Sequence, residues 1–286
     1  MIKKQLNRSA LTQLKSKYNR FELFDYFACL LIYKGLPKHI TLDRLSFSLI
    51  LELTNELSSF KGALTMAFNQ SYNTARPVMS TIETNKVLKN TYFLLAMTLA
   101  FSAVTAGISM AMNLPYFMGL VFSLISLGVL FVVHKKADSA SGVAWVFVFT
   151  GLMGAGLGPM LNYYAAMPNG PMLIMQALGS TALIFFGLSA YALTTKKDFS
   201  FMGGFLTVGL IVVIIASLVN LFIGSSITFM VINAAVVLIM SGLILFDTSR
   251  IINGGETNYI RATVALYLNV YNLFTSLLHL LGASDD

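Results

Sequence analysis

The chain has 286 residues, of which 56% are hydrophobic and only 11% are charged. A soluble domain carries about 25% charged residues, so this composition excludes an ordinary soluble protein and predicts a polytopic membrane protein. The net charge of +7 comes mostly from residues 1–78, which hold eleven Lys and Arg against five Asp and Glu, whereas residues 79–286 hold eight against seven. No basic patch is left for the body of the protein, which argues against nucleic-acid binding.

Residues 1–78 differ in character from the rest of the chain. The apolar run Phe27–Tyr33 is too short to cross a bilayer, which takes about 20 residues. Leu42–Met66 mixes charged and apolar residues at loosely helical spacing, which indicates an amphipathic cytoplasmic or surface segment. The alternative is a mis-assigned start, with the natural chain beginning at Met66 or Met79. We assign no function to this N-terminal extension.

Residues 79–286 are predicted to form an all-α domain, a bundle of seven transmembrane helices. A short polar leader, residues 79–90, is followed by seven apolar segments, each long enough to span the hydrocarbon core. The predicted spans are Thr91–Met112, Leu114–Val133, Gly142–Tyr164, Pro171–Thr194, Phe201–Ile223, Ile227–Ile252 and Tyr259–Gly282.

The basic residues predict how these spans are oriented. Those of residues 79–286 all fall before the first span or in alternate loops, and the other loops have none. Because short cytoplasmic loops are enriched in Lys and Arg, the N terminus is predicted to be cytoplasmic and the C terminus to lie outside. The residues concerned are Lys86, Lys89, Lys135, Lys136, Lys196, Lys197, Arg250 and Arg261.

The third span carries small residues at a spacing that suits close helix packing. Gly154 and Gly158 lie four residues apart, and Pro159 follows them. Glycines at this spacing let two backbones approach, so we expect a packing role rather than a ligand-binding one. Four amides lie in or near the spans and are expected to make interhelical hydrogen bonds, or together to line a hydrated path: Asn162, Gln176, Asn220 and Asn233.

Asp247 is the one acidic residue inside an apolar run of the predicted spans. It lies about 30 Å along the helix from the outer start of the sixth span, and therefore near the cytoplasmic end. Carboxylates in such positions are costly and are functional by default, as groups that titrate or hold a cation. The alternative is a local ion pair with Arg250, three residues further on the same helical face.

Asn269 in the seventh span is expected to lie within reach of Asp247, although an amide cannot share a proton as a second carboxylate would. His134, at the cytoplasmic end of the second span, has a side chain that titrates near neutral pH. An interfacial histidine is more often inert, and we interpret His279, near the outer end of the last span, in the same way. The candidate ion- or pH-sensing residues are Asp247, Asn269, Arg250 and His134.

The sequence lacks the motifs of intramembrane and soluble enzymes. It contains no HExxH, no GxSxG and no glycine-rich phosphate loop, and its spans offer one carboxylate where an aspartyl protease needs two. The single cysteine, Cys29, excludes an internal disulfide and a cysteine-based metal site. We therefore predict a protein that is not an enzyme and that uses no metal or other cofactor.

Four stretches together resemble the Bax inhibitor family, the transmembrane Bax inhibitor motif proteins. They are KVLKNTYFLL, FTGLMGAGLGPMLN, LSAYALTTKKDFSFMGG and ILFDTSRIINGGETNYIRATVALYLNVYNLF. The resemblance covers residues 79–286 and leaves residues 1–78 outside, which favours the mis-assigned start. It implies six helices around a central seventh.

Within that family the chain is similar to a bacterial inner-membrane member that modulates the membrane-anchored AAA protease FtsH. This implies an inner (plasma) membrane protein with a periplasmic C terminus, which binds the protease and its associated complex and slows the degradation of membrane proteins. The N-terminal tail would be the part that the protease engages.

The family also implies an alternative function, since some members are pH-sensitive calcium leaks. Two aspartates and a basic latch gate the leak in those members. Asp247 matches the first aspartate, Asn269 stands where the second would be, and His134 or a neighbouring lysine replaces the latch arginine. Calcium or protons would then be further partners, with Asp247 at the cytoplasmic mouth.

Overall fold

The computed structural model describes the backbone of residues 81–285 and the side chains of residues 84–283. Within this range the chain forms seven helices and no strand: α4 (Thr81–Ala111), α5 (Phe117–Lys136), α6 (Gly142–Ala165), α7 (Gly170–Thr195), α8 (Met202–Ile223), α9 (Ser226–Ile252) and α10 (Tyr259–Asp285). All seven are long and apolar enough to cross a membrane. The predicted seven-span, all-α class is confirmed, while the predictions for residues 1–78 lie outside the described residues.

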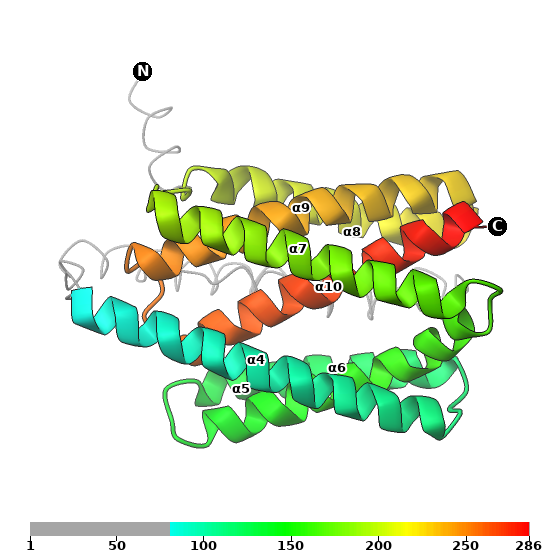
Figure 1. Cartoon of the computed structure of the whole chain (residues 1–286), viewed down its shortest axis with the longest axis horizontal. Coiled ribbons are helices and arrows are strands. Elements are labelled where there is room, and N and C mark those ends of the chain that lie inside the picture. Colours follow the sequence, from blue (N-terminus) through cyan, green and yellow to red (C-terminus); the bar gives the residue numbers. More distant parts are fainter. Residues whose placement is uncertain (1–80, 286) are drawn as a thin grey trace, which may run out of the picture. The chain divides into compact units, whose positions relative to one another are not determined.

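Helix α10 runs through the middle of the bundle, between two groups of three helices (Figure 1). Helices α4, α5 and α6 form one group and α7, α8 and α9 the other, and α10 packs against α4, α6, α7 and α9. Helix α5 packs chiefly on α6 and α8 chiefly on α9, so these two are peripheral. The apolar window of α10 is 56% buried, the largest share of any described span, which confirms the central seventh helix.

Most helix ends agree with the predicted spans to within three residues, and the first two helices differ for local reasons. Helix α4 begins at Thr81, ten residues before the predicted start of the first span. Residues 81–90 contain neither Gly nor Pro, so nothing in them interrupts the helix. Helix α5 begins at Phe117 rather than Leu114. Just before it, Asn113 adopts a left-handed backbone with φ 48°, and Pro115 has no amide hydrogen to donate to a helix.

Glycines bring α4 and α6 into direct contact along a line that we call the α4–α6 seam, formed by Ser102, Ser109, Gly154 and Gly158. A Cβ atom at Gly154 would overlap the Ser102 carbonyl oxygen, and one at Gly158 would overlap the Ser109 side chain. The Ser109 hydroxyl donates a hydrogen bond of 2.7 Å to the Ala155 carbonyl. The packing role predicted from the glycine spacing is confirmed.

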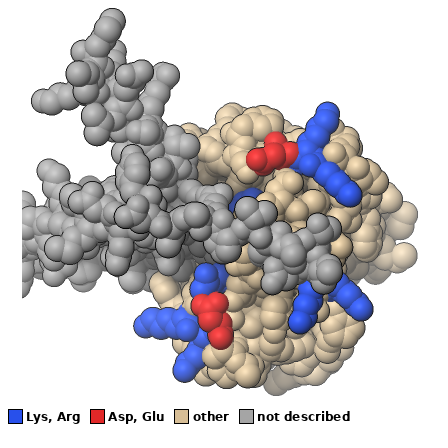
Figure 2. All heavy atoms as spheres, turned by 90° about the vertical axis from the view of Figure 1, so that its left-hand side faces the viewer, with Lys and Arg blue, Asp and Glu red and all other residues tan. Residues whose placement is uncertain are grey.

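The lysine and arginine side chains of the described residues gather at one end of the bundle, which we call the basic end (Figure 2). This end holds the start of α4, the ends of α5, α7 and α9, and the start of α10. At the opposite end, the described loops that join the helices carry neither Lys nor Arg. The basic end contains Lys86, Lys89, Lys135, Lys136, Lys196, Lys197, Arg250 and Arg261.

Candidate functional site

Asp247 and Asn269 meet inside the bundle and form what we call the Asp–Asn junction. Asp247 lies five residues before the end of α9 and is 5% exposed, and Asn269 lies on α10 and is 3% exposed. The Asn269 side-chain amide donates a hydrogen bond of 2.7 Å to a carboxylate oxygen of Asp247. The proximity expected from the two helices is confirmed, and the distance is that of a normal hydrogen bond.

The junction is a polar contact buried between two helices. A carboxylate removed from water needs a hydrogen-bond donor. Asn269 supplies the donor but cannot take the place of a second acid in sharing a proton. In the described part of the chain, no group of three His, Cys, Asp or Glu side chains is placed to hold a metal ion.

Arg250 belongs to the turn that follows α9. Its guanidinium donates a hydrogen bond of 3.1 Å to the Gly255 carbonyl, lies 3.8 Å from the Glu256 carboxylate and sits over the Phe246 ring. The Asp247 carboxylate contacts Asn269 on α10. The two side chains have these different contacts although Asp247 and Arg250 lie three residues apart on α9. Arg250 therefore contacts the α9–α10 loop.

His134 lies in the last turn of α5 and is half-buried. Because α5 packs chiefly on α6, His134 belongs to the group of helices across α10 from Asp247 (Figure 1). The four candidate residues therefore divide into one joined pair, Asp247 and Asn269, and two side chains in separate surroundings at the same end.

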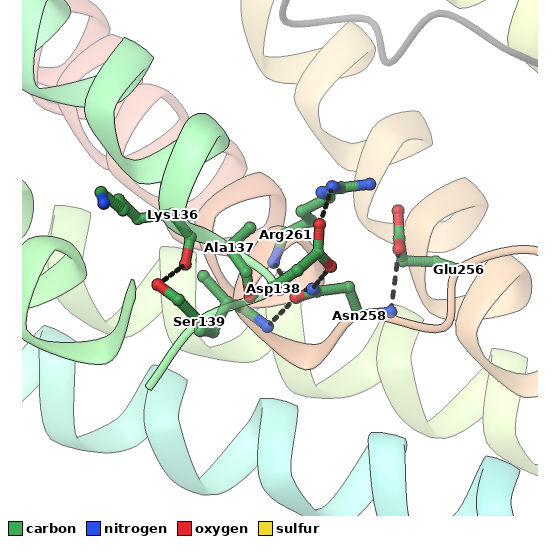
Figure 3. Close-up of polar contacts among 8 residues, drawn as sticks. Lys136, Ala137, Asp138, Ser139, Glu256, Asn258 and Arg261 are labelled. Carbon is green, nitrogen blue, oxygen red and sulfur yellow. Dashed lines mark hydrogen bonds and ion pairs between the residues drawn. The ribbon is translucent and has the colours of Figure 1, made fainter. Parts of the chain in front are cut away.

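Asn258 ties the start of α10 to the turn between α5 and α6 (Figure 3). Its side-chain oxygen accepts hydrogen bonds from the amides of Ile260 and Arg261, at 2.9 and 3.2 Å, and so caps the helix. Its side-chain nitrogen donates to the Ala137 carbonyl at 2.9 Å and to the Asp138 carboxylate at 2.7 Å. Arg261 adds an ion pair of 2.8 Å with Asp138.

Ser249 makes the corresponding connection at the end of α9. Its hydroxyl accepts a hydrogen bond from the Phe199 amide and donates one to the Lys197 carbonyl, each 3.0 Å long. In the same loop, hydrogen bonds from Ser200 lower the pKa of the exposed Asp198 carboxyl. These contacts fix the α7–α8 loop against α9, only two residues from Asp247.

Sequence reasoning identified the Asp–Asn junction but missed Asn258 and Ser249. An asparagine directly before a helix is a recognised cap, so the helix-capping role of Asn258 had a signal in the sequence. Its contact with the α5–α6 turn had no signal in the sequence, because that turn lies 120 residues away along the chain. Ser249 likewise contacts a loop about 50 residues away, which only the folded structure brings to it.

Comparison with known proteins supports the assignment of the bundle to a family. The family model described as "Inhibitor of apoptosis-promoting Bax1" matches residues 84–286. An uncharacterized membrane protein of Vibrio cholerae is 60% identical over 207 residues, which cover 72% of this chain and 93% of that protein.

Two Escherichia coli proteins match over the same part of the chain. The K12 protein named "Modulator of FtsH protease YccA" is 51% identical over 209 residues, covering 72% of this chain and 94% of that protein. The protein of strain CFT073, with the same identity and coverage, is named "Inner membrane protein YccA". These names describe a modulator and membrane proteins rather than enzymes. With a bundle of seven membrane-spanning helices and a match that covers it, the chain belongs to the Bax inhibitor family.

Proposed function

We propose that this chain is a regulatory inner-membrane protein that binds the membrane-anchored AAA protease FtsH and modulates its degradation of membrane proteins. The observation that carries this proposal is the 51% identity with the modulator of FtsH protease from Escherichia coli, over 94% of that protein. The aligned length of 209 residues corresponds to the size of the described bundle, so the similarity concerns a whole membrane domain and not an isolated motif.

The loops of the basic end support a binding role, since they present a fixed surface. Asn258 holds the α9–α10 loop to the α5–α6 turn, and Ser249 holds the α7–α8 loop to the end of α9. By the positive-inside rule we expect the basic end and the N terminus to face the cytoplasm. The C terminus then lies in the periplasm.

Crosslinking in native membranes tests this proposal. The full chain carries a C-terminal affinity tag, is crosslinked before solubilisation in mild detergent and is purified, and the protease is quantified by mass spectrometry. We expect FtsH in the crosslinked product, and less of it when the tagged chain begins at Met79, since the tail is the proposed point of engagement. Crosslinked product without FtsH, from full chain that is correctly inserted, would contradict the proposal.

The Asp–Asn junction favours a second candidate function, a cation leak with Asp247 near the cytoplasmic mouth. A buried carboxylate held by the central helix is the type of group that binds protons or cations inside a membrane. Asp247→Asn keeps the shape and the acceptor for Asn269 but removes the charge. Asp138→Asn is the matched control, because that carboxylate is exposed at the same end.

Calcium flux into proteoliposomes decides this second candidate. We expect the wild-type chain and Asp138→Asn to conduct equally, and Asp247→Asn to conduct at least several-fold less. Flux that equals that of empty liposomes, or flux that Asp247→Asn leaves unchanged, would remove the leak function. Either result leaves the protease-binding proposal to its own test.

A further inference from the structure

The central helix α10 carries a polar side chain, Asn272, near its middle. Asn272 comes 13 residues after Tyr259, the first residue of α10, which places it about 20 Å along a helix of 27 residues. The Thr275 hydroxyl donates a hydrogen bond of 3.1 Å to the main-chain carbonyl of Asn272. The side-chain amide of Asn272, however, has no hydrogen-bond partner among the described residues, and the side chain is partly exposed.

Two other amides inside the bundle show what Asn272 lacks. Asn269 donates a hydrogen bond of 2.7 Å to Asp247, and Asn162 donates one of 3.0 Å to the Met110 carbonyl. An amide removed from water without such a partner costs free energy, because lipid tails and apolar side chains offer it no hydrogen bond. Asn272 therefore marks a place on α10 where a further polar group would stabilise the protein.

Asn272 belongs to a face of α10 that we call the α10 strip. The strip consists of four partly exposed residues whose spacings of four, three and four place them on one side of the helix: Leu268, Asn272, Thr275 and His279. At one end of the strip, the His279 Nδ1 atom lies 3.1 Å from the side-chain oxygen of Asn233 on α9, and the His279 ring centroid lies 6.1 Å from that of Tyr164 on α6. The strip therefore faces between α6 and α9.

The described helices leave the α10 strip uncovered. Within the described part of the chain, α6 and α9 make at most isolated contacts with each other, and the same holds for α5 and α8 with α10. On either side of the strip, Asn269 contacts Asp247 of α9, and the Tyr267 ring centroid lies 5.8 Å from that of Phe149 on α6. The strip is thus flanked by two helices that do not close over it.

We propose that the α10 strip binds a transmembrane helix of the protease complex, one that carries a hydrogen-bonding side chain at the depth of Asn272. This inference rests on the proposed function and names the surface through which the two proteins meet inside the membrane. Because an amide both donates and accepts, a serine, threonine, asparagine or glutamine of the partner helix would complete its hydrogen bonds. Polar side chains of this kind join helices to one another in membranes.

Other occupants fit the α10 strip less well. Lipid tails cover apolar surface but have no group that bonds to an amide. In a symmetric pair of copies of this chain, the same surface of each copy would meet its equivalent. Each strip lies on the central helix between two groups of three helices, so the flanking helices would hold the two strips apart (Figure 1). A single helix of a different protein meets no such obstacle.

Site-specific photocrosslinking in native membranes tests the α10 strip. A benzoylphenylalanine placed at Leu268, one turn from Asn272, is compared with one placed at Leu183 on α7, which is 77% exposed. We expect the probe at Leu268, but not the probe at Leu183, to give a product with a membrane-spanning peptide of FtsH or its associated complex. Products with lipid, with another copy or with unrelated proteins alone would overturn the inference. Capture of FtsH by the tagged full chain would then leave the proposed function intact.

Substitution of Asn272 tests the hydrogen bond to the partner helix, with recovery of FtsH by the tagged, crosslinked chain as the measurement. We expect Asn272→Leu to recover about three- to tenfold less FtsH, the loss typical of one interhelical hydrogen bond in a membrane, and Asn272→Gln to restore most of it. Gln176→Leu, which removes an exposed amide from α7, should leave recovery unchanged. Equal recovery with Asn272→Leu and wild type would overturn the inference, and FtsH missing from the wild-type product would contradict the proposed function.

Unfolding of the same variants separates binding from folding. Asn272→Leu removes a side chain that has no described hydrogen-bond partner, so its denaturant midpoint should equal that of the wild type, whereas Asn269→Leu should lower the midpoint. A midpoint lowered as far by Asn272→Leu as by Asn269→Leu would place the partner of Asn272 inside this chain and overturn the inference.

Discussion

The α4–α6 seam and the α9–α10 interface are held together by different kinds of contact. At the seam, glycines bring one helix backbone against the other, and the polar groups are serine hydroxyls and main-chain carbonyls. The α9–α10 interface is joined by side-chain pairs at two levels, Asp247 with Asn269 and Asn233 with His279. The seam therefore depends on close backbone packing, whereas the α9–α10 interface depends on hydrogen bonds between polar side chains.

Gly154→Ala should give the largest loss of stability, because it breaks the seam. The added methyl group would overlap the Ser102 carbonyl oxygen, which is main chain and cannot rotate away. We expect the free energy of unfolding to fall by about 3 kcal/mol. Unfolding in mixed detergent micelles, followed by the fluorescence of Trp145 on α6, measures it.

Gly107→Ala on α4 is the matched control for the seam, since a Cβ atom added there would meet no atom of a neighbouring helix within 4 Å. It should change the free energy of unfolding by less than about 1 kcal/mol. Equal effects of Gly107→Ala and Gly154→Ala would show that the close backbone contact at Gly154 does not stabilise the bundle.

Asn269→Leu should have an intermediate effect, because it removes a hydrogen-bond donor from the buried Asp247 carboxylate. We expect the free energy of unfolding to fall by about 1–3 kcal/mol. Unfolding in mixed detergent micelles measures it, with Asn272→Leu on the same helix as control. Equal losses in the two variants would show that the Asp–Asn pair is not what stabilises the α9–α10 interface.

Asp138→Asn should have the smallest effect, although it removes the ion pair between the α5–α6 turn and α10. The Asp138 side chain is 75% exposed and that of Arg261 37%, and exposed ion pairs contribute less than about 1 kcal/mol. The Asn258 amide can still donate to the new side chain. Asn258→Ala, which removes the helix cap as well, should cost about 1 kcal/mol. The same unfolding measurement ranks the two variants, and the reverse order would contradict this account of the turn.

The sequence was most informative where one segment alone determines the outcome. Apolar length fixed the number of spans, and the spacing of Gly154 and Gly158 predicted a packing role that the seam confirms. The predicted start of α5 was three residues too early. Hydropathy carries no information on backbone conformation, and the positive φ of Asn113 interrupts the helix. The start of α4 was misplaced because polar residues can be helical outside the hydrocarbon.

The candidate site was predicted only in part, because its contacts depend on three-dimensional neighbours. Simple helix geometry brought Asn269 to Asp247, and the hydrogen bond between them confirms it. The contacts of Arg250 with Gly255 and Glu256 depend on the turn after α9, which the spacing of Arg250 from Asp247 does not describe. His279 looked like an isolated histidine until the fold placed Asn233, Phe229 and Tyr164 around it.

Reconstituted degradation tests the central claim, that this bundle modulates a membrane protease, most directly. Purified FtsH and a membrane-protein substrate are placed in proteoliposomes with or without the full chain, and substrate loss is followed over time. We predict slower loss of substrate when the chain is present, while the chain itself stays intact. An unchanged rate of loss, with the folded chain in excess over the protease, would contradict the account.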